Sequence, residues 1–139
     1  MSKKQLRVLD YLEHIKQAIE RIERYTSDID EVGFMKNEMA QDAVIRNVEI
    51  VGEAANNIMK CDADFAKQHN DVPWAVIYAM RNRVSHGYHT VDLGIVWQSV
   101  QTDLPLLGQK VVALLNILEH DSSSPPFAKV EGNENLPPS

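Results

Sequence analysis

Apolar residues recur at steps of three or four positions along most of the chain. In the first part of the sequence they are Leu6, Leu9, Leu12, Ile15, Ile19, Ile22 and Tyr25. A repeat near 3.6 residues places such side chains on one face of an α-helix, whereas a half-buried strand needs a repeat of two. The same helical spacing returns over 35–58 and 93–118, and no stretch alternates as a strand would. The sequence therefore predicts an all-α fold.

The breaks in this pattern divide the chain into helices. The spacing predicts four amphipathic helices, over about 6–25, 35–60, 72–85 and 93–118. Pro73 suits the first turn of the third helix, and Asp92 is the expected N-cap of the fourth. Pro105 should kink or split the fourth helix, because proline lacks a backbone donor. Connections of this length favour an antiparallel up-and-down bundle of four to five helices.

Length and composition set the boundaries of this bundle. A chain of 139 residues fits one domain, which we place at 1–120. Residues 121–139 are rich in Pro and Ser without periodicity, so we expect a flexible tail there. No apolar run suits a membrane span or a signal peptide, and we expect a cytoplasmic protein without membrane association. The single cysteine, Cys61, excludes a disulfide framework and lacks the companions of a zinc site. We also expect no metal and no cofactor.

The charge balance limits how the chain can bind an anion. Fourteen basic residues against twenty acidic ones leave a net charge of −6, which opposes binding of nucleic acid by bulk electrostatics. Any nucleic acid must therefore bind at a local positive site. Basic residues gather at Arg81 and Arg83, and Arg46 and Lys36 are candidates to extend that site. Dimerisation would double it.

One stretch at the predicted end of the third helix combines three reactive side chains. It reads Arg81-Asn82-Arg83-Val84-Ser85-His86-Gly87-Tyr88, and its glycine is placed to close the helix. Taken singly, such an arginine is usually solvated, such a histidine favours the helix dipole, and such a tyrosine packs. Together, Arg81, His86 and Tyr88 offer a fixed cation, an imidazole that titrates near neutral pH and a phenol. That combination suits phosphodiester cleavage, and the sequence lacks phosphate-loop, zinc-protease and nucleophile-elbow motifs.

The spacing of Arg81 and His86 constrains how they can act together. Five residues of continuous α-helix separate two side chains by about 140° around the axis and about 7.5 Å along it. The two groups therefore do not share one face of a regular helix. Either the helix loosens before Gly87 and turns His86 back, or a symmetric dimer pools two copies of the third helix. We expect both to contribute.

The second predicted helix carries small residues and a set of charged ones. The small residues, which let a neighbouring helix or a second subunit approach, are Ala43, Gly52, Ala54 and Ala55. Gly52 itself weakens the helix by about 1 kcal/mol relative to alanine. The charged residues, interpreted as structural or interface groups rather than direct catalysts, are Arg46, Glu49 and Glu53.

The stretch from Arg81 to Tyr88 resembles the Arg-x4-His-x-Tyr signature of HepT-type toxins, a branch of the HEPN ribonuclease superfamily. Three further segments resemble the family in the same order along the chain. They are 42–55, Val72-Pro73-Trp74 and Val96-Trp97. The resemblance covers about residues 5 to 118 and implies a HEPN-like helical bundle.

This resemblance implies an activity and partners. The expected protein is the toxin of a toxin-antitoxin system, a homodimeric, metal-independent ribonuclease whose active cleft lies at the dimer interface and whose substrate is tRNA or mRNA. The expected partner is an MntA-type nucleotidyltransferase antitoxin that transfers AMP to Tyr88. The added group would bring bulk and negative charge beside His86 and block the cleft.

Roles follow for the residues of the motif. We expect His86 to act as general base or acid on the 2′-hydroxyl and the leaving oxygen, and Arg81 to stabilise charge on the scissile phosphate. Asn82 either binds phosphate or orders the turn, and Arg83 either contacts the RNA backbone or forms an exposed salt bridge. Two other interpretations stay open. One is a non-catalytic HEPN docking or nucleotide-binding partner of a nucleotidyltransferase, and the other is a purely structural bundle.

Overall fold

The computed structural model describes residues 2–85 and 92–123, and within these residues the chain forms α-helices and no strands. The helices are α1 (Lys3–Thr26), α2 (Glu31–Lys36), α3 (Glu38–Cys61), α4 (Ala63–Gln68), α5 (Trp74–Ser85), α6 (Leu93–Gln101) and α7 (Asp103–Ser123). The all-α prediction is confirmed, and the four long predicted segments correspond to α1, α3, α5 and the pair α6–α7. Residues 124–139, most of the expected tail, lie outside the described part.

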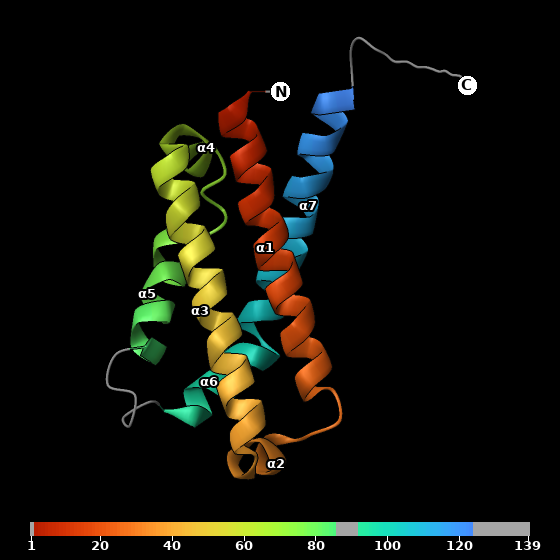
Figure 1. Cartoon of the computed structure of the whole chain (residues 1–139), viewed down its shortest axis with the longest axis vertical. Helices are drawn as coiled ribbons and strands as arrows, with labels where there is room; N and C mark the ends of the chain where they lie inside the picture. Colours follow the sequence, from red (N-terminus) through yellow and green to blue (C-terminus); the bar gives the residue numbers. More distant parts are fainter. Residues whose placement is uncertain (1, 86–91, 124–139) are drawn as a thin grey trace, which may run out of the picture.

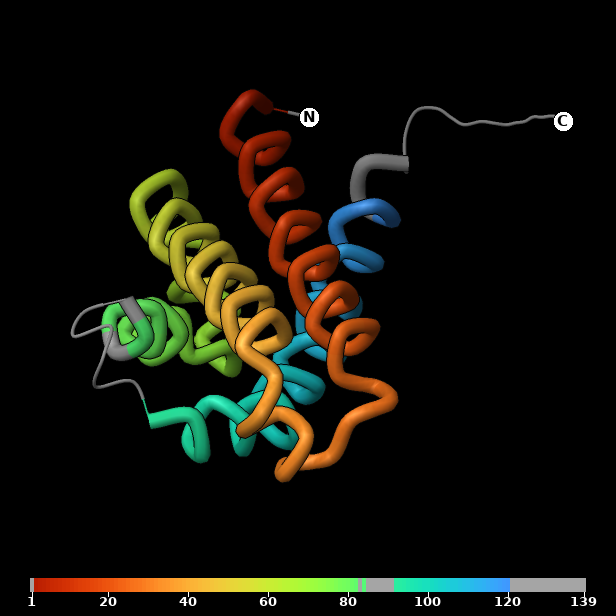
Figure 2. The backbone as a smooth tube through the Cα atoms, turned by 60° about the horizontal axis from the view of Figure 1, so that its bottom comes forward, coloured from red at the N-terminus to blue at the C-terminus, as the bar shows by residue number. Residues whose placement is uncertain are grey.

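The long helices pack around α3. Helix α3 lies between α1 and α5, and α7 packs on α1. Their direction alternates, because α1 and α5 descend in Figure 1 whereas α3 and α7 ascend. Figure 2 shows α5 at the outer side of the bundle, next to α3. Within the described residues, the side of α5 away from α3 exposes Ala75, Val76 and Ala79.

Short polar side chains start most of these helices. Ser2 and Gln5 form a reciprocal capping box at the start of α1. The other side chains that accept a backbone N–H in the first turn are Asp30, Asn37, Asp62 and Asp92. The cap expected at Asp92 is confirmed, since its carboxylate accepts the N–H groups of Gly94 and Ile95 at 2.9 and 3.2 Å.

Two segments expected as connections contain short helices. Helix α2 lies in the segment between the first two long helices, and α4 lies in the polar stretch after Cys61. Each short helix has an aspartate cap and buries one phenylalanine, Phe34 in α2 and Phe65 in α4. A single buried aromatic side chain carries a large apolar area. One such anchor and one cap thus order a turn that is too short to show periodicity.

The last predicted helix is divided, but before the expected proline. Helix α6 ends at Gln101 and α7 begins at Asp103, with Thr102 between them. Pro105 lies in the first turn of α7, where its missing N–H has no intrahelical partner to lose. The break expected at Pro105 is therefore three residues too late. Proline starts this helix rather than interrupting it.

The start of α5 is fixed by a buried tryptophan. Trp74 is 4% exposed, and its indole N–H donates to the carbonyl oxygens of Ala66 and His69, both at 3.2 Å. This contact ties the first residue of α5 to the end of α4.

In residues 2–85 and 92–123, none of the helices combines the length and apolarity that crossing a membrane requires.

Candidate active site

Arg81 lies on α5 and faces α3. Its side chain is 29% exposed, and its Cβ packs directly over Gly52 of α3. An added Cβ on residue 52 would overlap that of Arg81, so glycine is what permits the approach. The close packing predicted for the small residues of this helix is confirmed at Gly52, where the neighbour is α5.

Three side chains hold the guanidinium of Arg81. Its Nε lies 3.2 Å from Oε2 of Glu53 on α3, and one terminal nitrogen donates to Oδ1 of Asn82 at 2.9 Å. The guanidinium carbon lies 5.8 Å from the ring centroid of Tyr78, within cation–π range. The carboxylate is half exposed, so its pairing with Arg81 adds little to stability but fixes the direction of the cation.

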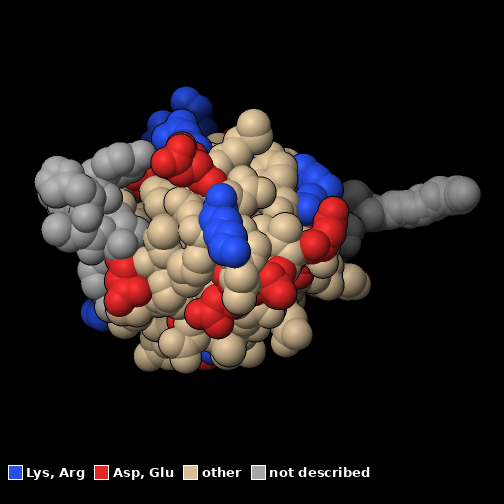
Figure 3. Space-filling view, turned by 90° about the horizontal axis from the view of Figure 1, so that it is seen from below, with Lys and Arg blue, Asp and Glu red and all other residues tan. Residues whose placement is uncertain are grey.

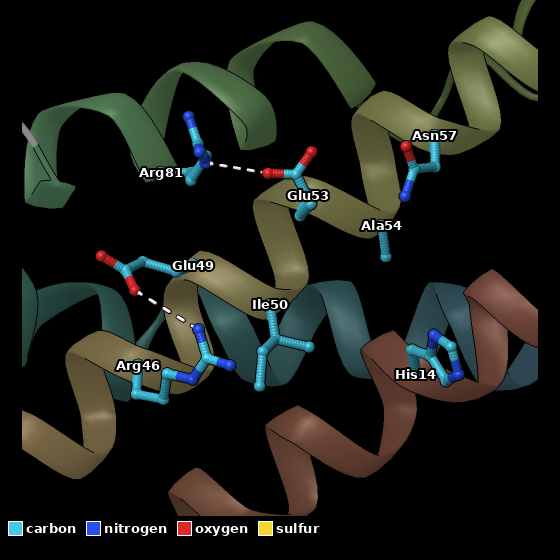
Figure 4. Close-up of a pocket in the computed structure, with 8 residues that line it drawn as sticks. All are labelled: His14, Arg46, Glu49, Ile50, Glu53, Ala54, Asn57 and Arg81. Carbon is cyan, nitrogen blue, oxygen red and sulfur yellow. Dashed lines mark ion pairs between the residues drawn. The ribbon is translucent and has the colours of Figure 1, made fainter.

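Arg81 borders a pocket of about 440 Å³ between α1, α3 and α5. One stripe of α3 lines it, with residues at helical spacing: Arg46, Glu49, Ile50, Glu53, Ala54 and Asn57. Helix α1 adds His14 on the opposite side from α5. Figure 4 shows Arg81 and Glu53 meeting across the gap between α5 and α3, with His14 on the neighbouring helix.

The pocket changes the interpretation of the second predicted helix. Glu53, which we expected to be a structural or interface group, directly contacts Arg81. Arg46, a candidate to extend the positive site, lines the same pocket, whereas Lys36 at the end of α2 is not among its lining residues. Sequence reasoning missed His14 and Asn57. The spacing Glu49, Glu53, Asn57 would have indicated the second of these, but nothing in the sequence places α1 beside it.

The remaining motif residues lie partly outside the described structure. Helix α5 extends through Ser85, and the loosening expected before Gly87 is not seen up to that residue. His86, Gly87 and Tyr88 lie in the segment 86–91, outside the described residues. The expected role of Arg83 also lies outside the description, which covers its backbone on α5 but not its side chain.

The charge on one end of the bundle agrees with a local site. On the end of the bundle seen in Figure 3, basic and acidic side chains are scattered among uncharged ones, without a continuous basic surface on its described part. Only local cation placement can therefore attract a phosphate at this end. Among the described residues, no group of three or more His, Cys, Asp or Glu side chains is arranged to hold a metal ion.

The sequence match to a known family covers the α3 and α5 parts of this region and begins just after His14. Residues 15–114 match the family described as ribonuclease HepT-like, which is well over half of the chain. The chain belongs to the HepT-like ribonuclease family. The matched range contains α3 and α5, the two helices that carry Gly52, Glu53 and Arg81.

Individual relatives agree with this family. The chain is 42% identical over 101 residues to a protein of Thermococcus cleftensis named "Probable ribonuclease HepT", covering 73% of this chain and 89% of the relative. It is 34% identical over 105 residues to a "Putative RNase" of Caldanaerobacter subterraneus subsp. tengcongensis, covering 76% of this chain and 91% of that protein.

A longer relative shares only one of its parts. A Methanocaldococcus jannaschii protein, named "Gamma-glutamylcyclotransferase and putative RNase", is 37% identical over 114 residues. The match covers 82% of this chain but spans about half the length of that relative, 50%. No solved structure shows a significant match to the chain.

Proposed function

We propose that this member of the HepT-like family is the toxin of a toxin-antitoxin system and cleaves tRNA or mRNA without a metal ion. The observation that carries the proposal is the placement of Arg81. The motif's cation is held over Gly52, oriented by Glu53, and set at the edge of a pocket large enough for part of an RNA chain. A purely structural arginine does not need such an orientation.

The proposed reaction transfers the phosphate from one ribose oxygen to another. A neutral His86 removes the proton from the 2′-hydroxyl, and that oxygen attacks the adjacent phosphorus. The bond from phosphorus to the 5′-oxygen breaks, and a protonated His86 gives its proton to that leaving oxygen. The products are a 2′,3′-cyclic phosphate and a free 5′-hydroxyl. Arg81 stabilises the negative charge that develops on the non-bridging oxygens, and Asn82 assists in orienting the phosphate.

Two copies of His86 divide the base and acid roles in this proposal, which requires a homodimer with the cleft at its interface. The outer face of α5 supports such a contact. A rotation of 100° per residue places Ala75, Ala79 and Asn82 on one side of the helix, and both alanines are exposed. Small side chains let two helices approach closely. A symmetric contact here would bring two Arg81–Tyr88 stretches together.

An MntA-type nucleotidyltransferase antitoxin is the proposed partner, and Tyr88 is the proposed acceptor of AMP. The phenol oxygen attacks the α-phosphate of ATP and pyrophosphate leaves, so the tyrosine proton is lost. The added phosphate competes with RNA for Arg81 and fills the space beside His86.

Cleavage is tested with purified protein in EDTA. We expect wild type to cut tRNA or mRNA and His86→Ala to lose at least about a hundredfold in rate, the usual scale for removing a general acid or base. An inactive wild type, or a fully active His86→Ala, would contradict the proposal.

The modification is tested by intact-mass spectrometry after co-expression with the nucleotidyltransferase. We expect wild type to gain one or more AMP masses and Tyr88→Phe to gain none. The same gain in Tyr88→Phe would place the modification on another residue.

A non-catalytic docking partner of a nucleotidyltransferase is the second candidate, favoured by the net charge of −6. The two candidates differ in their effect on growth. Catalysis predicts growth arrest on expression of wild type and none with Arg81→Ala, whereas a docking module predicts no arrest with either.

A further inference from the structure

Two polar side chains of the pocket beside Arg81 have no hydrogen-bond partner within residues 2–85 and 92–123. They are His14 on α1 and Asn57 on α3, and both line the pocket. The ring of His14 meets the ring of Tyr11 edge to face, at 6.3 Å between centroids. Its ring nitrogens, and the carboxamide of Asn57, are therefore available to a ligand in the pocket.

The floor of the same pocket is apolar. Ile50 and Ala54 lie one helical turn apart on α3, between the polar groups of α1 and α5. A nucleobase presents an apolar face together with an edge of hydrogen-bond donors and acceptors. Ile50 and Ala54 suit the face of the base. The carboxamide of Asn57, which has both donor and acceptor atoms, suits its edge. The exposed imidazole of His14 offers a second surface on which a base can stack.

Arg46 places a cation at the other end of the row of α3 residues that lines the pocket. The side chain of Arg46 is 72% exposed and meets Glu49 at 3.9 Å, the long limit for an ion pair. A pair this exposed and this long holds the guanidinium only weakly. Arg46 is therefore free to turn toward a phosphate, at a distance of three turns of helix from Asn57. Arg81 adds a second cation on the opposite wall.

We propose that this pocket is a subsite for one nucleotide of single-stranded RNA, next to the scissile phosphate. The base lies on Ile50 and Ala54 beneath His14, Asn57 reads its edge, and Arg46 binds a flanking phosphate. The volume of about 440 Å³ falls in the roughly 300–1,000 Å³ range of small-molecule sites. The subsite rests on the proposed ribonuclease function, because it supplies binding to the chain that Arg81 and His86 cut.

Binding is measured apart from cleavage by using His86→Ala as the parent. Fluorescence anisotropy with a short fluorescein-labelled single-stranded RNA of mixed sequence, in EDTA, gives Kd for the parent and for added changes His14→Ala, Asn57→Ala and Arg46→Ala. We expect each change to raise Kd about five- to tenfold, the loss of one good hydrogen bond or charge contact. Asn57→Asp, which keeps the shape and adds negative charge, should bind at least as weakly as Asn57→Ala.

Matched changes outside the pocket serve as controls. They are His120→Ala and Asn116→Ala on α7 and Arg24→Ala near the end of α1, all at exposed positions. We expect them to leave Kd within about twofold of the parent, and far-UV circular dichroism checks that every variant is folded. With His86 restored, the pocket changes should raise KM and leave kcat within about threefold, since they act on binding common to ground and transition states.

The outcomes separate the subsite from the proposed function. Weaker RNA binding by the pocket variants supports the subsite even if wild type cuts no RNA. Unchanged Kd in all three pocket variants overturns it even if wild type is an active ribonuclease. A parent that binds no RNA overturns it as well.

Discussion

Gly52 of α3 and Arg81 of α5 are in direct contact, with no room for a methyl group between them. An added Cβ on residue 52 would overlap the Cβ of Arg81 and stand 3.1 Å from its Cγ and 3.3 Å from the carbonyl oxygen of Ile77. A Cβ atom and a backbone carbonyl cannot turn aside as the end of a side chain can. The glycine therefore sets the separation of α3 and α5 where Arg81 meets the pocket.

Replacing Gly52 by alanine should destabilise the protein, because the steric penalty exceeds the gain in helix propensity. Gly52→Ala improves helix propensity by about 1 kcal/mol, but it forces two packed helices apart, and overpacking typically costs about 1–3 kcal/mol. Because the contacts lie on backbone and Cβ atoms, we expect the steric cost to win. The free energy of unfolding in urea should fall by about 1–2 kcal/mol, and the rate of RNA cleavage should fall as Arg81 moves.

Gly108 provides the matched control for this prediction. It also lies within a helix, α7, but an added Cβ would be 3.4 Å from Cγ2 of Ile19, an ordinary contact. Gly108→Ala should therefore leave stability unchanged or raise it by up to about 1 kcal/mol. If both alanine variants were equally stable and active, the close contact at Gly52 would carry no constraint.

Glu53 should matter for activity more than for stability. Its carboxylate holds Nε of Arg81 at 3.2 Å, yet it is half exposed. We expect Glu53→Gln to change the free energy of unfolding by less than about 1 kcal/mol. The kcat for RNA cleavage should fall about tenfold, because the guanidinium loses the charge that orients it, while KM changes little.

Glu13→Gln tests whether the loss of any surface ion pair has the same effect. Glu13 pairs with Lys16 on α1 at 3.7 Å and is not among the residues that line the pocket of Arg81. We expect this variant to cleave RNA like wild type. Equal kcat in Glu53→Gln and wild type would mean that Arg81 needs no positioning by this carboxylate.

Apolar periodicity was enough to predict the long helices but not the short ones. The stripe from Leu6 to Tyr25 predicts α1 because seven apolar residues repeated over about five helical turns leave little ambiguity. Helices α2 and α4 have six residues each, too few for a period, and they depend on tertiary burial of Phe34 and Phe65. The prediction of a helix break at Pro105 is wrong because proline also suits the first turn of a helix. The sequence does not distinguish the two cases, whereas in the structure the chain breaks at Thr102 and Pro105 falls in the first turn of α7.

The candidate site was predicted only where its residues are close in sequence. Arg81 and Asn82 belong to one linear motif, and their contact at 2.9 Å is local. The pairing of Arg81 with Glu53, and the position of His14 across the pocket, depend on how α1, α3 and α5 pack. Helical spacing tells which face of a helix is apolar, but it does not tell which polar residues of two different helices meet.

Asn47 connects α1 to α3 by a partly buried hydrogen bond. It is 4% exposed, accepts from Nε of Arg21 at 2.8 Å and donates to the carbonyl of Ala43 at 2.8 Å. A double-mutant cycle with Arg21→Met and Asn47→Ala should give a coupling free energy of about 1–2 kcal/mol in urea unfolding, since the bond involves a charged group.

A surface pair provides the comparison for that cycle. Glu13→Gln and Lys16→Met remove a partly exposed ion pair on the surface of α1, for which we expect a coupling below about 0.5 kcal/mol. A coupling of the same small size for Arg21 and Asn47 would show that their hydrogen bond does not hold α1 on α3.

The outer face of α5 should be where a second copy binds. Ala79 is exposed on this face, between Ala75 and Asn82, whereas Arg81, two residues further on, faces α3. A buried, unpaired carboxylate is strongly unfavourable at an interface, so Ala79→Glu should convert a dimer to a monomer in light scattering coupled to size-exclusion chromatography. RNA cleavage should fall as the dimer is lost, because each half of the site then lacks its partner.

Ala113→Glu is the control, because it makes the same change at an exposed position on α7. It should leave both the molecular mass and the rate of RNA cleavage as in wild type. A dimer that persists in Ala79→Glu places the interface elsewhere, and a monomeric wild type that cleaves RNA means that one chain holds the complete site.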